Sequence, residues 1–530
     1  AIFRERKDFY SGSFGIAYHF DHDHHHVHVS PRDFQRTLAI LKHDMGFDLL
    51  SDIAVIAVTD HPMYQAKYSQ AKWDITYHLF HLEAHQRLQL HLLLGAGEVL
   101  PSILDLYPGA TRFEREARER LGEHVASEQP LTLPSYPTNP NLSEAPYPEE
   151  LNQWYLFDLN HPATRHQFAL AVEADDGKIR NSWLQTGYWK RNWEARATEL
   201  TPVGFAPLLD GLLPEAAPLV SCAWAKTVED YFLWRIPERA QAIRMILMEL
   251  SRIASHMRVL GHVAEELGVS EASQVCRETR ERIRSVLGFH SGSRMTTEAT
   301  QIGGLPQNLP PGWIQEATSL LRGIDGALGL YRRMVTHHPL ARRRLKVAGV
   351  TAREALEAGV TGPALRASGV NFDLRKSRPF YFYQDIDFDV PVGLHGQAHD
   401  RVLIMMEENR QSLRILWQVL DNLPLGEIRI DLPGLDEFLQ GQRSVSTWGE
   451  WYTRADRAWS AQYTAVEGPS GELGFHLGLV PDSALIASLK IKTNAINLAQ
   501  SLPIFLKHCP VSELALALSS LNLEASAVDR

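Results

Sequence analysis

The chain has few cysteines, and their scarcity excludes several classes of protein. Only three occur among 530 residues, namely Cys222, Cys276 and Cys509, and they lie far apart in the sequence. This spacing excludes a disulfide scaffold and a CxxC metal knuckle, and it leaves too few thiolates for an iron–sulfur cluster. The pattern is typical of a reducing, cytosolic compartment.

Membrane-inserting segments and an excess of positive charge are also missing. No run reaches the ~18 apolar residues that a spanning helix requires. Residues 1–10 carry five charged groups instead of the apolar core of a secretory signal. We therefore expect any link to a membrane to be made through partner subunits. The formal net charge of −10 argues against nucleic acid as a partner, because such proteins present a basic face.

The composition and length indicate a folded protein of at least two domains. Hydrophobic residues make up 44% and charged residues 22% of the chain, which is typical of a globular protein, and 530 residues exceed one ordinary core. A stretch rich in Pro, Ser and Asn is the best boundary. We predict a small α/β domain at residues 1–126, a Pro-rich linker at 127–150 and a larger domain at 151–530.

In the first domain, the spacing of apolar residues predicts both strands and helices. Alternation in residues 20–29 (HHVHV) and two runs, Trp73–Leu82 and Gln86–Leu94, predict strands, the last two joined by a short turn. Residues 34–42 and 111–121 have helical spacing.

The second domain begins with strands and continues with long helices. A strand-rich entry at 153–189 contains a turn at Asp175–Gly177, and Pro237 stands where a helix begins. A stripe of apolar residues from Ile243 to Leu260 predicts a helix packed in a bundle, and similar helices are predicted at 312–336 and 401–423, before a mixed tail from Glu472. The fold class is α+β.

A histidine cluster is the first candidate for chemistry. His22, His24, His26 and His28 would share one face of a strand, with His25 between them on the other. Such a stripe is compatible with metal binding or with a solvated strand edge, and the sequence leaves both open. No P-loop, GxGxxG, HExxH or GxSxG motif occurs, so nothing indicates binding of ATP or NAD.

Longer motifs carry a family resemblance over most of residues 30–530. GVTGPALRASGVNFDLRKSRPFYFYQDIDFDVPVG from Gly359, IPERAQAIRMILMELSRIASH from Ile236, and GELGFHL from Gly471 with the terminal SSLNLEASAVDR resemble the 49-kDa subunit of respiratory complex I. They also resemble the large subunit of membrane-bound nickel–iron hydrogenases. YHLFHLEAHQRLQLHL from Tyr77 and LPSILDLYPGATRFEREARERLG from Leu100 resemble the 30-kDa subunit. The resemblance implies a fused C/D subunit of complex I (NADH-quinone oxidoreductase), with a hydrogenase-large-subunit-like second domain.

The resemblance also locates the family's nickel ligands, which are two pairs of cysteines. In this chain the four positions are Leu213, Ala216, Glu524 and Ala527. Soft thiolates are what hold such a metal. We therefore expect no metal at these positions and no hydrogenase activity.

The quinone-facing positions of the complex I relatives have changed as well. The family directs a histidine from an HPxxH turn and a tyrosine at the quinone, because reducing a quinone requires donors to its carbonyl oxygens. His161 retains the first histidine, but Arg165 stands at the second and His166 comes one residue late. The tyrosine position is Pro214, which has no donor. Glu266 matches the acid that supports the histidine.

Further positions imply docking and structure. Arg191 matches an arginine that lies against the partner's iron–sulfur cluster, so we expect it to dock that partner. We expect further partner contacts around His161 and in Leu365–Arg375. Within that last run, Arg366, Asp373 and Arg375 are expected in buried ion pairs that serve structure alone.

Two functions remain, and they differ in whether quinone is reduced. In the first, the chain is a peripheral subunit at the cytoplasmic face of the cell membrane, which docks a small iron–sulfur electron-transfer subunit onto ion-translocating membrane subunits. It binds no cofactor itself. In the alternative it forms a remodelled quinone site of a multisubunit oxidoreductase. We favour the first, because Arg165 and Pro214 have changed together. A stand-alone binding protein is opposed by the extent of the motifs.

Overall fold

The structure is a computed structural model, and it describes most of the chain. The described residues are 17–21, 24–57, 71–95, 97–122, 154–294, 299–431, 435, 437, 461–480 and 485–530. The predicted linker at 127–150 and His22 lie outside them. The chain divides into two compact units, of which unit 1 comprises residues 1–152 and Leu356–Gly359, and unit 2 comprises residues 153–355 and 360–530.

In its described residues, unit 1 is built on a five-stranded sheet with two helices. The strand order is β1-β2-β5-β4-β3, and β2 and β5 are parallel while the other neighbours are antiparallel. The strands are β1 (Ala17–Asp21), β2 (His24–Val29), β3 (Leu49–Ala57), β4 (Ala71–His81) and β5 (Gln86–Gly95). The helices are α2 (Phe34–His43) and α4 (Thr111–Leu121), the latter preceded by the short turn η2 (Pro108–Ala110).

The sheet of unit 1 separates an apolar face from a polar one. Leu88, Leu90 and Leu92 alternate along β5 and are fully buried, which makes them part of the unit's core. Gln89 and His91, which lie between these leucines on β5, are polar and pair in register with His26 and His28 of β2. The strand predicted at 20–29 is divided, because residues 20–21 belong to β1 and residues 24–29 to β2, which pair antiparallel. The predicted strands at 73–82 and 86–94 and the helices at 34–42 and 111–121 are confirmed, apart from end residues.

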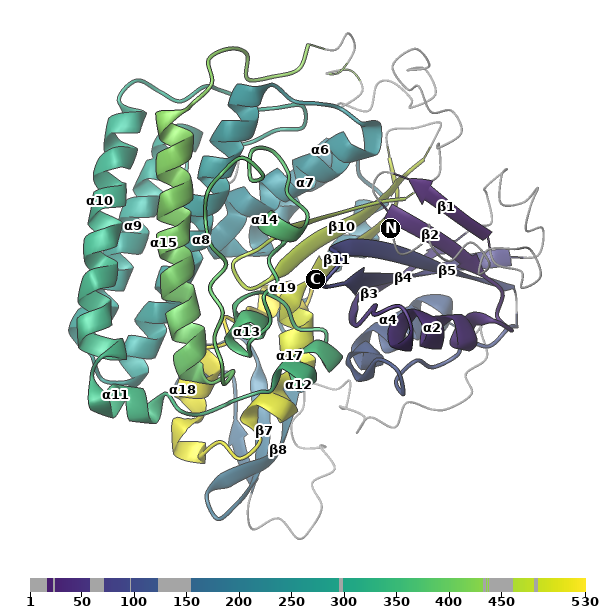
Figure 1. The fold of residues 1–530 in the computed structure, drawn as a ribbon, viewed down its shortest axis with the longest axis horizontal. Helices are drawn as coiled ribbons and strands as arrows, with labels where there is room; N and C mark the ends of the chain where they lie inside the picture. The colour runs from purple at the N-terminus through teal and green to yellow at the C-terminus, as the bar shows by residue number, and fades with distance from the viewer. Residues whose placement is uncertain are drawn as a thin grey trace. The chain divides into compact units, whose positions relative to one another are not determined.

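Unit 2 contains the predicted helix bundle. Its long helices are α7 (Ala217–Phe232), α8 (Glu238–Glu266), α9 (Ser270–Ser291), α10 (Trp313–Tyr331) and α15 (Ala398–Asp421). α8 contacts α7, α9 and α15, while α10 contacts α9 and α15 (Figure 1). The apolar stripe from Ile243 to Leu260 is buried in this bundle, which confirms the prediction of a core helix.

Two three-stranded antiparallel sheets complete unit 2, together with short helices. One sheet holds β6 (Trp154–Phe157), β7 (Ala169–Asp175) and β8 (Lys178–Gln185), and the other holds β9 (Gln462–Glu467), β10 (Glu472–Leu479) and β11 (Ile486–Thr493). The remaining helices are α5 (Trp193–Ala197), α6 (Pro202–Phe205), α11 (Pro339–Arg344), α12 (Ala352–Glu357), α13 (Gly362–Ala367), α14 (Leu374–Ser377), α17 (Asn494–Leu506), α18 (Leu514–Ser519) and α19 (Ala525–Val528). The short helical turns are η5 (Pro162–Thr164), η6 (Ala206–Gly211), η7 (Pro214–Ala216), η8 (Arg332–Thr336) and η11 (Val511–Glu513).

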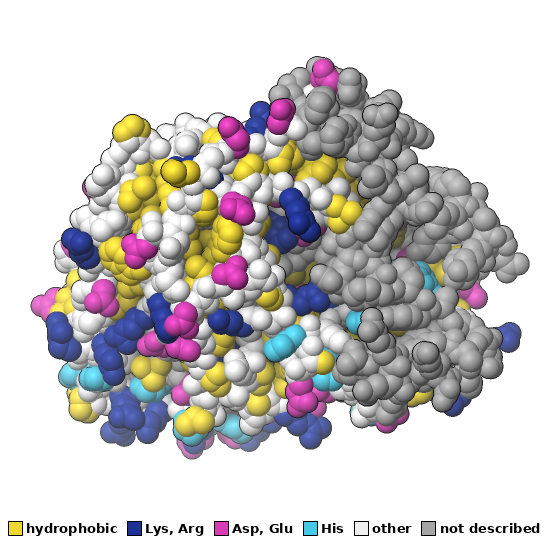
Figure 2. Space-filling view, turned by 45° about the horizontal axis from the view of Figure 1, so that its top comes forward, with side chains coloured by type: hydrophobic (Ala, Val, Ile, Leu, Met, Phe, Trp, Pro, Cys, Tyr) yellow, Lys and Arg dark blue, Asp and Glu magenta, His cyan; other side chains and the backbone are white. Residues whose placement is uncertain are grey.

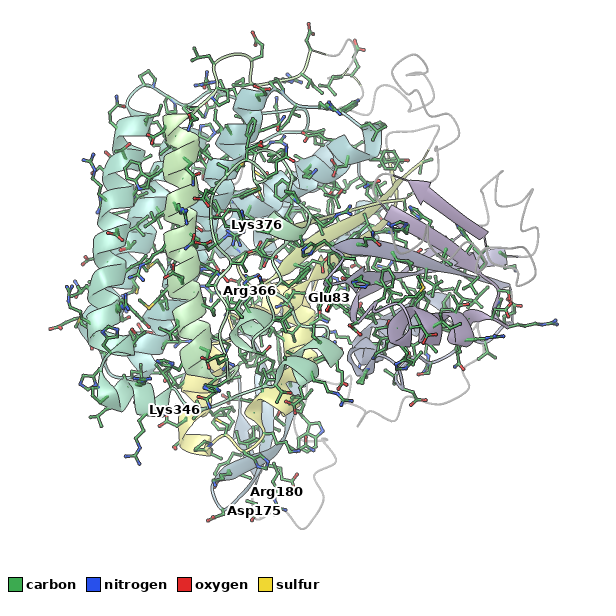
Figure 3. All side chains as sticks on the ribbon, viewed as in Figure 1. Glu83, Asp175, Arg180, Lys346, Arg366 and Lys376 are labelled. Atoms are coloured by element: carbon green, nitrogen blue, oxygen red, sulfur yellow. The ribbon has the colours of Figure 1, made fainter. Side chains whose placement is uncertain are left out.

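A buried ion-pair network joins the elements of unit 2. Arg366 of α13 donates to Glu408 of α15 at 2.7 Å and to Glu467 of β9 at 2.8 Å. Figure 3 shows Arg366 within unit 2, beside α15. Arg375 of α14 pairs with Asp373 at 2.7 Å. These side chains are almost fully buried, so the expectation of buried structural ion pairs for Arg366, Asp373 and Arg375 is confirmed.

Glu249 of α8 completes this network. Its carboxylate pairs with Arg375 at 3.1 Å and Arg252 at 3.2 Å, and it accepts hydrogen bonds from Tyr383 and Ser412. Burial alone would raise the pKa of Glu249, but the two guanidinium groups and the hydroxyl donors hold it at about 2. The acid is therefore ionised and fully paired at neutral pH.

Close backbone contact brings two of the family motifs together. A Cβ on Gly362 would lie 2.4 Å from the Cα of Gly471, and both glycines have positive φ angles, +68° and +132°. The Oγ1 of Thr361 also accepts from the backbone N–H of Glu472 at 2.9 Å. Only glycine allows this approach without displacement of the chain.

Among the described residues, no single helix is both long and apolar enough to cross a bilayer. The segments Pro202–Gly211 and Pro214–Phe232 satisfy the length and composition test as a pair, but they are bent by 116°.

Removing one arginine tests the ion-pair network. Arg366→Ala would leave the carboxyl groups of Glu408 and Glu467 buried without their main partner. We expect it to lower the free energy of unfolding of unit 2 by roughly 3–5 kcal/mol. Arg410→Ala, which removes a surface pair with Glu407, is the control and should cost under about 1 kcal/mol. Urea unfolding followed by tryptophan fluorescence measures both, and equal costs would contradict a stabilising role.

Candidate functional site

The turn that carries His161 follows β6 and is held by its own polar groups. Asp158 accepts from the backbone N–H of Asn160 at 2.9 Å and of His161 at 3.0 Å, as an acid does at a tight turn. The hydroxyl of Thr164 donates to the carbonyl oxygen of Asp158 at 2.8 Å. These bonds fix the position of the histidine relative to the strand.

His161 is exposed, and one of its ring nitrogens is occupied. Its Nδ1 accepts from the backbone N–H of Ala163 at 3.2 Å, and Phe157 packs edge-on against the ring at 4.7 Å. An accepting Nδ1 places the proton of the neutral ring on Nε2. The turn thus orients an imidazole N–H donor outward.

Arg165, at the second position of the turn, is engaged in ion pairs. Its guanidinium lies 3.0 Å from Glu266 and 3.6 Å from Glu265 at the end of α8, and it donates to Ser519 of α18 at 3.3 Å. Its backbone is left-handed, with a φ of 50°. The arginine therefore ties the turn to two helices, and the acid expected behind His161 is bonded to Arg165 instead.

The other two quinone-facing positions offer no buried donor. The side chain of His166 is exposed, and its φ of 60° is left-handed. Pro214 is exposed and begins η7. The structure therefore places His161 and Arg165 in one turn. Pro214 offers no second hydrogen-bond donor, because proline has neither a hydroxyl nor an amide N–H.

The four positions that were expected to match nickel ligands lie on two segments that a hydrogen bond joins, and none of them carries a thiolate. Leu213, Ala216 and Ala527 are buried and apolar, while Glu524 pairs with Arg258 at 2.5 Å. The hydroxyl of Ser526 donates to the carbonyl oxygen of Leu212 at 3.1 Å, which links the two segments. A hydrocarbon lining with one carboxylate is unsuited to a soft metal.

Arg258, His262 and Glu266 form one charged face of α8 beside this turn. They are spaced by four residues, so their side chains lie on the same side of the helix. Burial and then the positive charges of Arg165 and Arg258 lower the pKa of His262 from 6.5 to about 3. In the unfolded chain His262 would take up a proton near pH 6.5, whereas in the folded chain it stays neutral down to about pH 3. The folded state therefore loses stability as the pH falls from about 6.5 towards 3.

These α8 residues were missed by reasoning from single motifs. The resemblance located only Glu266, whereas the spacing of Arg258, His262 and Glu266 would have indicated a polar helix face. Glu215 was also missed, and it pairs with Arg284 of α9 at 3.0 Å. The turn, η7, α8 and the C-terminal segment thus share one charged network.

A second exposed surface surrounds Arg191. Trp189 is 42% and Tyr188 38% exposed, and the guanidinium of Arg191 lies 5.7 Å from the ring centre of Trp193. The carboxylate of Asp529 accepts from the backbone N–H of Gly187 at 2.7 Å and of Trp189 at 3.1 Å. The C-terminal segment therefore holds in place a loop that presents two aromatic rings and an arginine.

The run Leu365–Arg375, from which partner contacts were expected, has its charged side chains buried within unit 2. Leu365, Arg366 and Arg375 are at most 1% exposed. Only Gly369 and Asn371 of this run are exposed. The charged side chains are paired within the internal ion-pair network, and the expectation of partner contacts from this run stays a prediction.

Two histidines of the predicted stripe, His26 and His28, lie on the polar face of the unit 1 sheet, whereas His22 and the side chain of His24 are outside what the structure describes. His26 Nδ1 lies 3.0 Å from His91 Nε2, the ring of His28 stacks on His91 at 4.4 Å, and His91 pairs with Asp74 at 2.9 Å. His25 registers with Leu88 on the other face. Within the ranges that the structure describes, no group of three or more His, Cys, Asp or Glu side chains is arranged to hold a metal ion.

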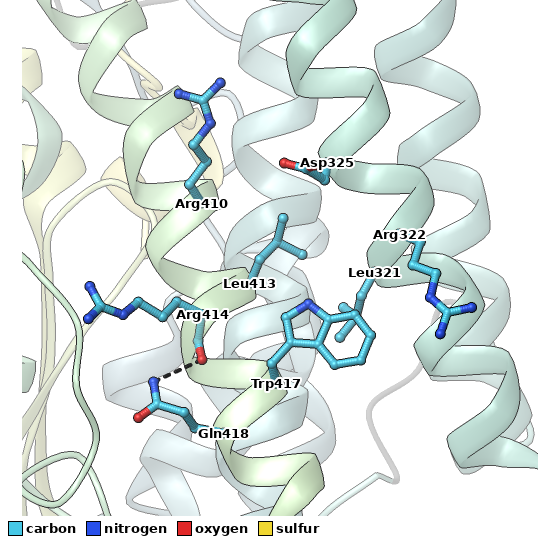
Figure 4. A pocket seen from close by; sticks show the side chains of 8 residues that line it. All are labelled: Leu321, Arg322, Asp325, Arg410, Leu413, Arg414, Trp417 and Gln418. Carbon is cyan, nitrogen blue, oxygen red and sulfur yellow. Dashed lines mark hydrogen bonds between the residues drawn. The ribbon is translucent and has the colours of Figure 1, made fainter.

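A surface groove of about 640 Å³ lies elsewhere, between α10 and α15 (Figure 4). Leu413 and Trp417 form its floor, and Arg322 and Arg410 stand at its sides. None of the quinone-facing or nickel-ligand positions lines it.

The pKa of His262 provides a test of the contacts between Arg165 and the charged residues of α8. In Arg165→Ala one neighbouring positive charge is removed and two carboxylates lose a partner, so the pKa of His262 should rise from about 3 towards 6.5. A histidine-selective NMR titration measures the pKa. Arg322→Ala, on the exposed side of α10, is the control and should leave it unchanged. An unchanged pKa in Arg165→Ala would disprove the assigned contact.

Two family descriptions match the chain, one for each unit. Residues 27–133 match "Respiratory-chain NADH dehydrogenase, 30 Kd subunit", and residues 266–530 match "Respiratory-chain NADH dehydrogenase, 49 Kd subunit".

Curated relatives cover both parts at once. The C/D subunit of NADH-quinone oxidoreductase from Bdellovibrio bacteriovorus is 30% identical over 95% of each chain, and that from Cereibacter sphaeroides is 28% identical over 91% of this chain and 90% of its own. The D subunit of NADH-quinone oxidoreductase from Methylacidiphilum infernorum is 32% identical over 78% of this chain and all of its own. The fold class, the fusion of two subunits and the arrangement of motifs agree with these matches. The chain therefore belongs to the family of fused C/D subunits of NADH-quinone oxidoreductase, the respiratory complex I.

Proposed function

We propose that the chain is a peripheral-arm subunit that docks an iron–sulfur subunit onto ion-translocating membrane subunits, with quinone reduction by the family's head-group donors lost. It acts at the cytoplasmic face of the cell membrane and holds no redox group of its own. The electron-carrying cluster belongs to the partner. Nickel chemistry has no ligands here, because the four positions are Leu213, Ala216, Glu524 and Ala527.

The ion pairs of Arg165 are the observation that carries this proposal. A guanidinium paired with Glu266 and bonded to Ser519 is not available to a quinone oxygen. It is also a poor proton source, since arginine keeps its proton at ordinary pH. Proline at 214 supplies no hydroxyl. In this proposal the turn no longer supplies two hydrogen-bond donors to a quinone, and Arg165 instead connects the turn to α8 and α18.

The surface around Arg191 supports the docking part of the proposal. Tyr188, Trp189 and Arg191 combine exposed aromatic area with a permanent charge, which are the residue types that dominate protein interfaces. Asp529 already holds their loop in place, so the loop loses little conformational entropy when a partner binds.

One observation favours the alternative of a remodelled quinone site. His161 keeps its place in the turn and presents an Nε2–H donor outward. A single imidazole could bond one quinone carbonyl oxygen and supply a proton as charge builds there. In that case the chain retains quinone reduction with one donor instead of two.

The docking surface can be tested by changing its centre. Trp189→Ala with Arg191→Glu should weaken binding of the purified iron–sulfur subunit by at least about tenfold, because it removes an aromatic anchor and reverses a charge. Binding is measured by calorimetry. Arg277→Glu, at a 57% exposed side chain on α9, is the matched control and should have no effect. Equal affinities in all three proteins would place docking elsewhere.

The rate at which the assembled complex reduces a quinone distinguishes the docking function from the remodelled quinone site. We expect the native complex to reduce a short-chain quinone slowly, and Arg165→His with Pro214→Tyr to raise the rate by about tenfold or more, because both donors return. Rates are measured with a low-potential electron donor. Fast turnover in the native complex that disappears in His161→Ala would overturn the scaffold proposal in favour of the one-donor site.

A further inference from the structure

One end of the helix bundle carries a concentration of positive charge. Residues 332–346 read RRMVTHHPLARRRLK, which includes six arginines and lysines, two histidines and no acid. The rest of the chain is acidic enough to give a net charge of −10. We call residues 332–346 the basic end; it comprises η8, α11 and the residues around them.

Most of these charges face solvent. Arg332, Arg333, Arg342, Arg343 and Lys346 are exposed, whereas Arg344 is partly covered and pairs with Glu513 at 2.9 Å. Figure 2 shows dark blue and cyan side chains gathered along the lower left edge, and Figure 1 shows α11 at the lower left of the bundle. One acid therefore offsets only the least exposed of the six.

The basic end also exposes apolar surface at its centre. Leu340 is 67% exposed, and the exposed Pro339 precedes it at the start of α11. Arginines flank Leu340 on both sides in the sequence, at 332–333 and 342–344. The basic end therefore presents one large apolar side chain among its cations.

The local charge influences a nearby half-buried histidine. His399 donates its backbone N–H to the carbonyl oxygen of Leu345, so it lies directly beneath the basic end. Burial lowers its pKa, Asp400 raises it, and Arg342 and Lys346 lower it further. Burial is the largest of these effects, and the contributions of Arg342 and Lys346 show that His399 lies within reach of the charge of the basic end.

We propose that the basic end binds the surface of an anionic phospholipid bilayer. Clustered arginines and lysines attract anionic headgroups, and a leucine among them can enter the headgroup boundary. A nucleic acid would satisfy the cations but would offer no apolar layer for Leu340. The inference goes beyond the proposed function, because none of the quinone-facing positions or docking residues belongs to the basic end.

Vesicle binding by the full-length chain tests this proposal. At an ionic strength of ~0.15 M, the chain should sediment with phosphatidylcholine vesicles that contain phosphatidylglycerol, and not with phosphatidylcholine alone. Arg342→Glu with Arg343→Glu should weaken binding by at least about tenfold, since each reversal replaces attraction by repulsion. Leu340→Ser should weaken it less, through loss of the inserted side chain.

Controls make the result specific. Arg196→Glu with Arg322→Glu reverses two exposed arginines outside the basic end and should leave binding unchanged, and circular dichroism confirms that each variant is folded. Equal binding to neutral vesicles, or equal loss in the control variant, would overturn the proposal. So would duplex DNA that binds as tightly as the anionic vesicles with no effect of Leu340→Ser, which would indicate a general polyanion site.

Discussion

The buried ion-pair network in unit 2 is the interaction on which the rest of that unit depends. Arg366 and Arg375 come from two short helices, and their carboxylate partners come from α8, α15 and β9. A buried charge is tolerated only when it is paired and hydrogen-bonded. Each of these helices is therefore fixed in position, because its buried charged side chains form ion pairs with those of the neighbouring elements. The glycine contact between Gly362 and Gly471 and the hydrogen bond from Glu472 to Thr361 hold the same segments together beside this network.

The same physical rule explains the candidate site. Arg165 enters a turn where the family has a histidine, and a half-buried guanidinium requires acids. Glu265 and Glu266 supply them, so the acid is withdrawn from His161. At the neighbouring nickel-ligand positions, Glu524 similarly requires Arg258. In the proposed function, these groups satisfy one another instead of acting on a ligand, and docking is the role that remains.

Much of the fold could be predicted from the sequence because it depends on local periodicity. The helix at 111–121 and the strand at 86–94 follow from the spacing of apolar residues, and the stripe from Ile243 to Leu260 is buried as its pattern requires. The long motifs indicated the family, which the matches over both units confirm. The resemblance to hydrogenase large subunits stays a prediction.

The sequence by itself determined which reactive groups are absent: no thiol at Leu213, Ala216, Glu524 and Ala527, where the hydrogenase resemblance predicts nickel ligands, and no hydroxyl at Pro214. Identity at a position is enough for that, because a missing atom cannot be supplied by folding. Only the tertiary structure decided what the remaining groups do. It paired Arg165 with Glu266 across about a hundred residues, and it buried Arg366 and Arg375, which the sequence also allowed as a docking run. Charge pairing over such distances depends on how helices pack, and no local pattern encodes it.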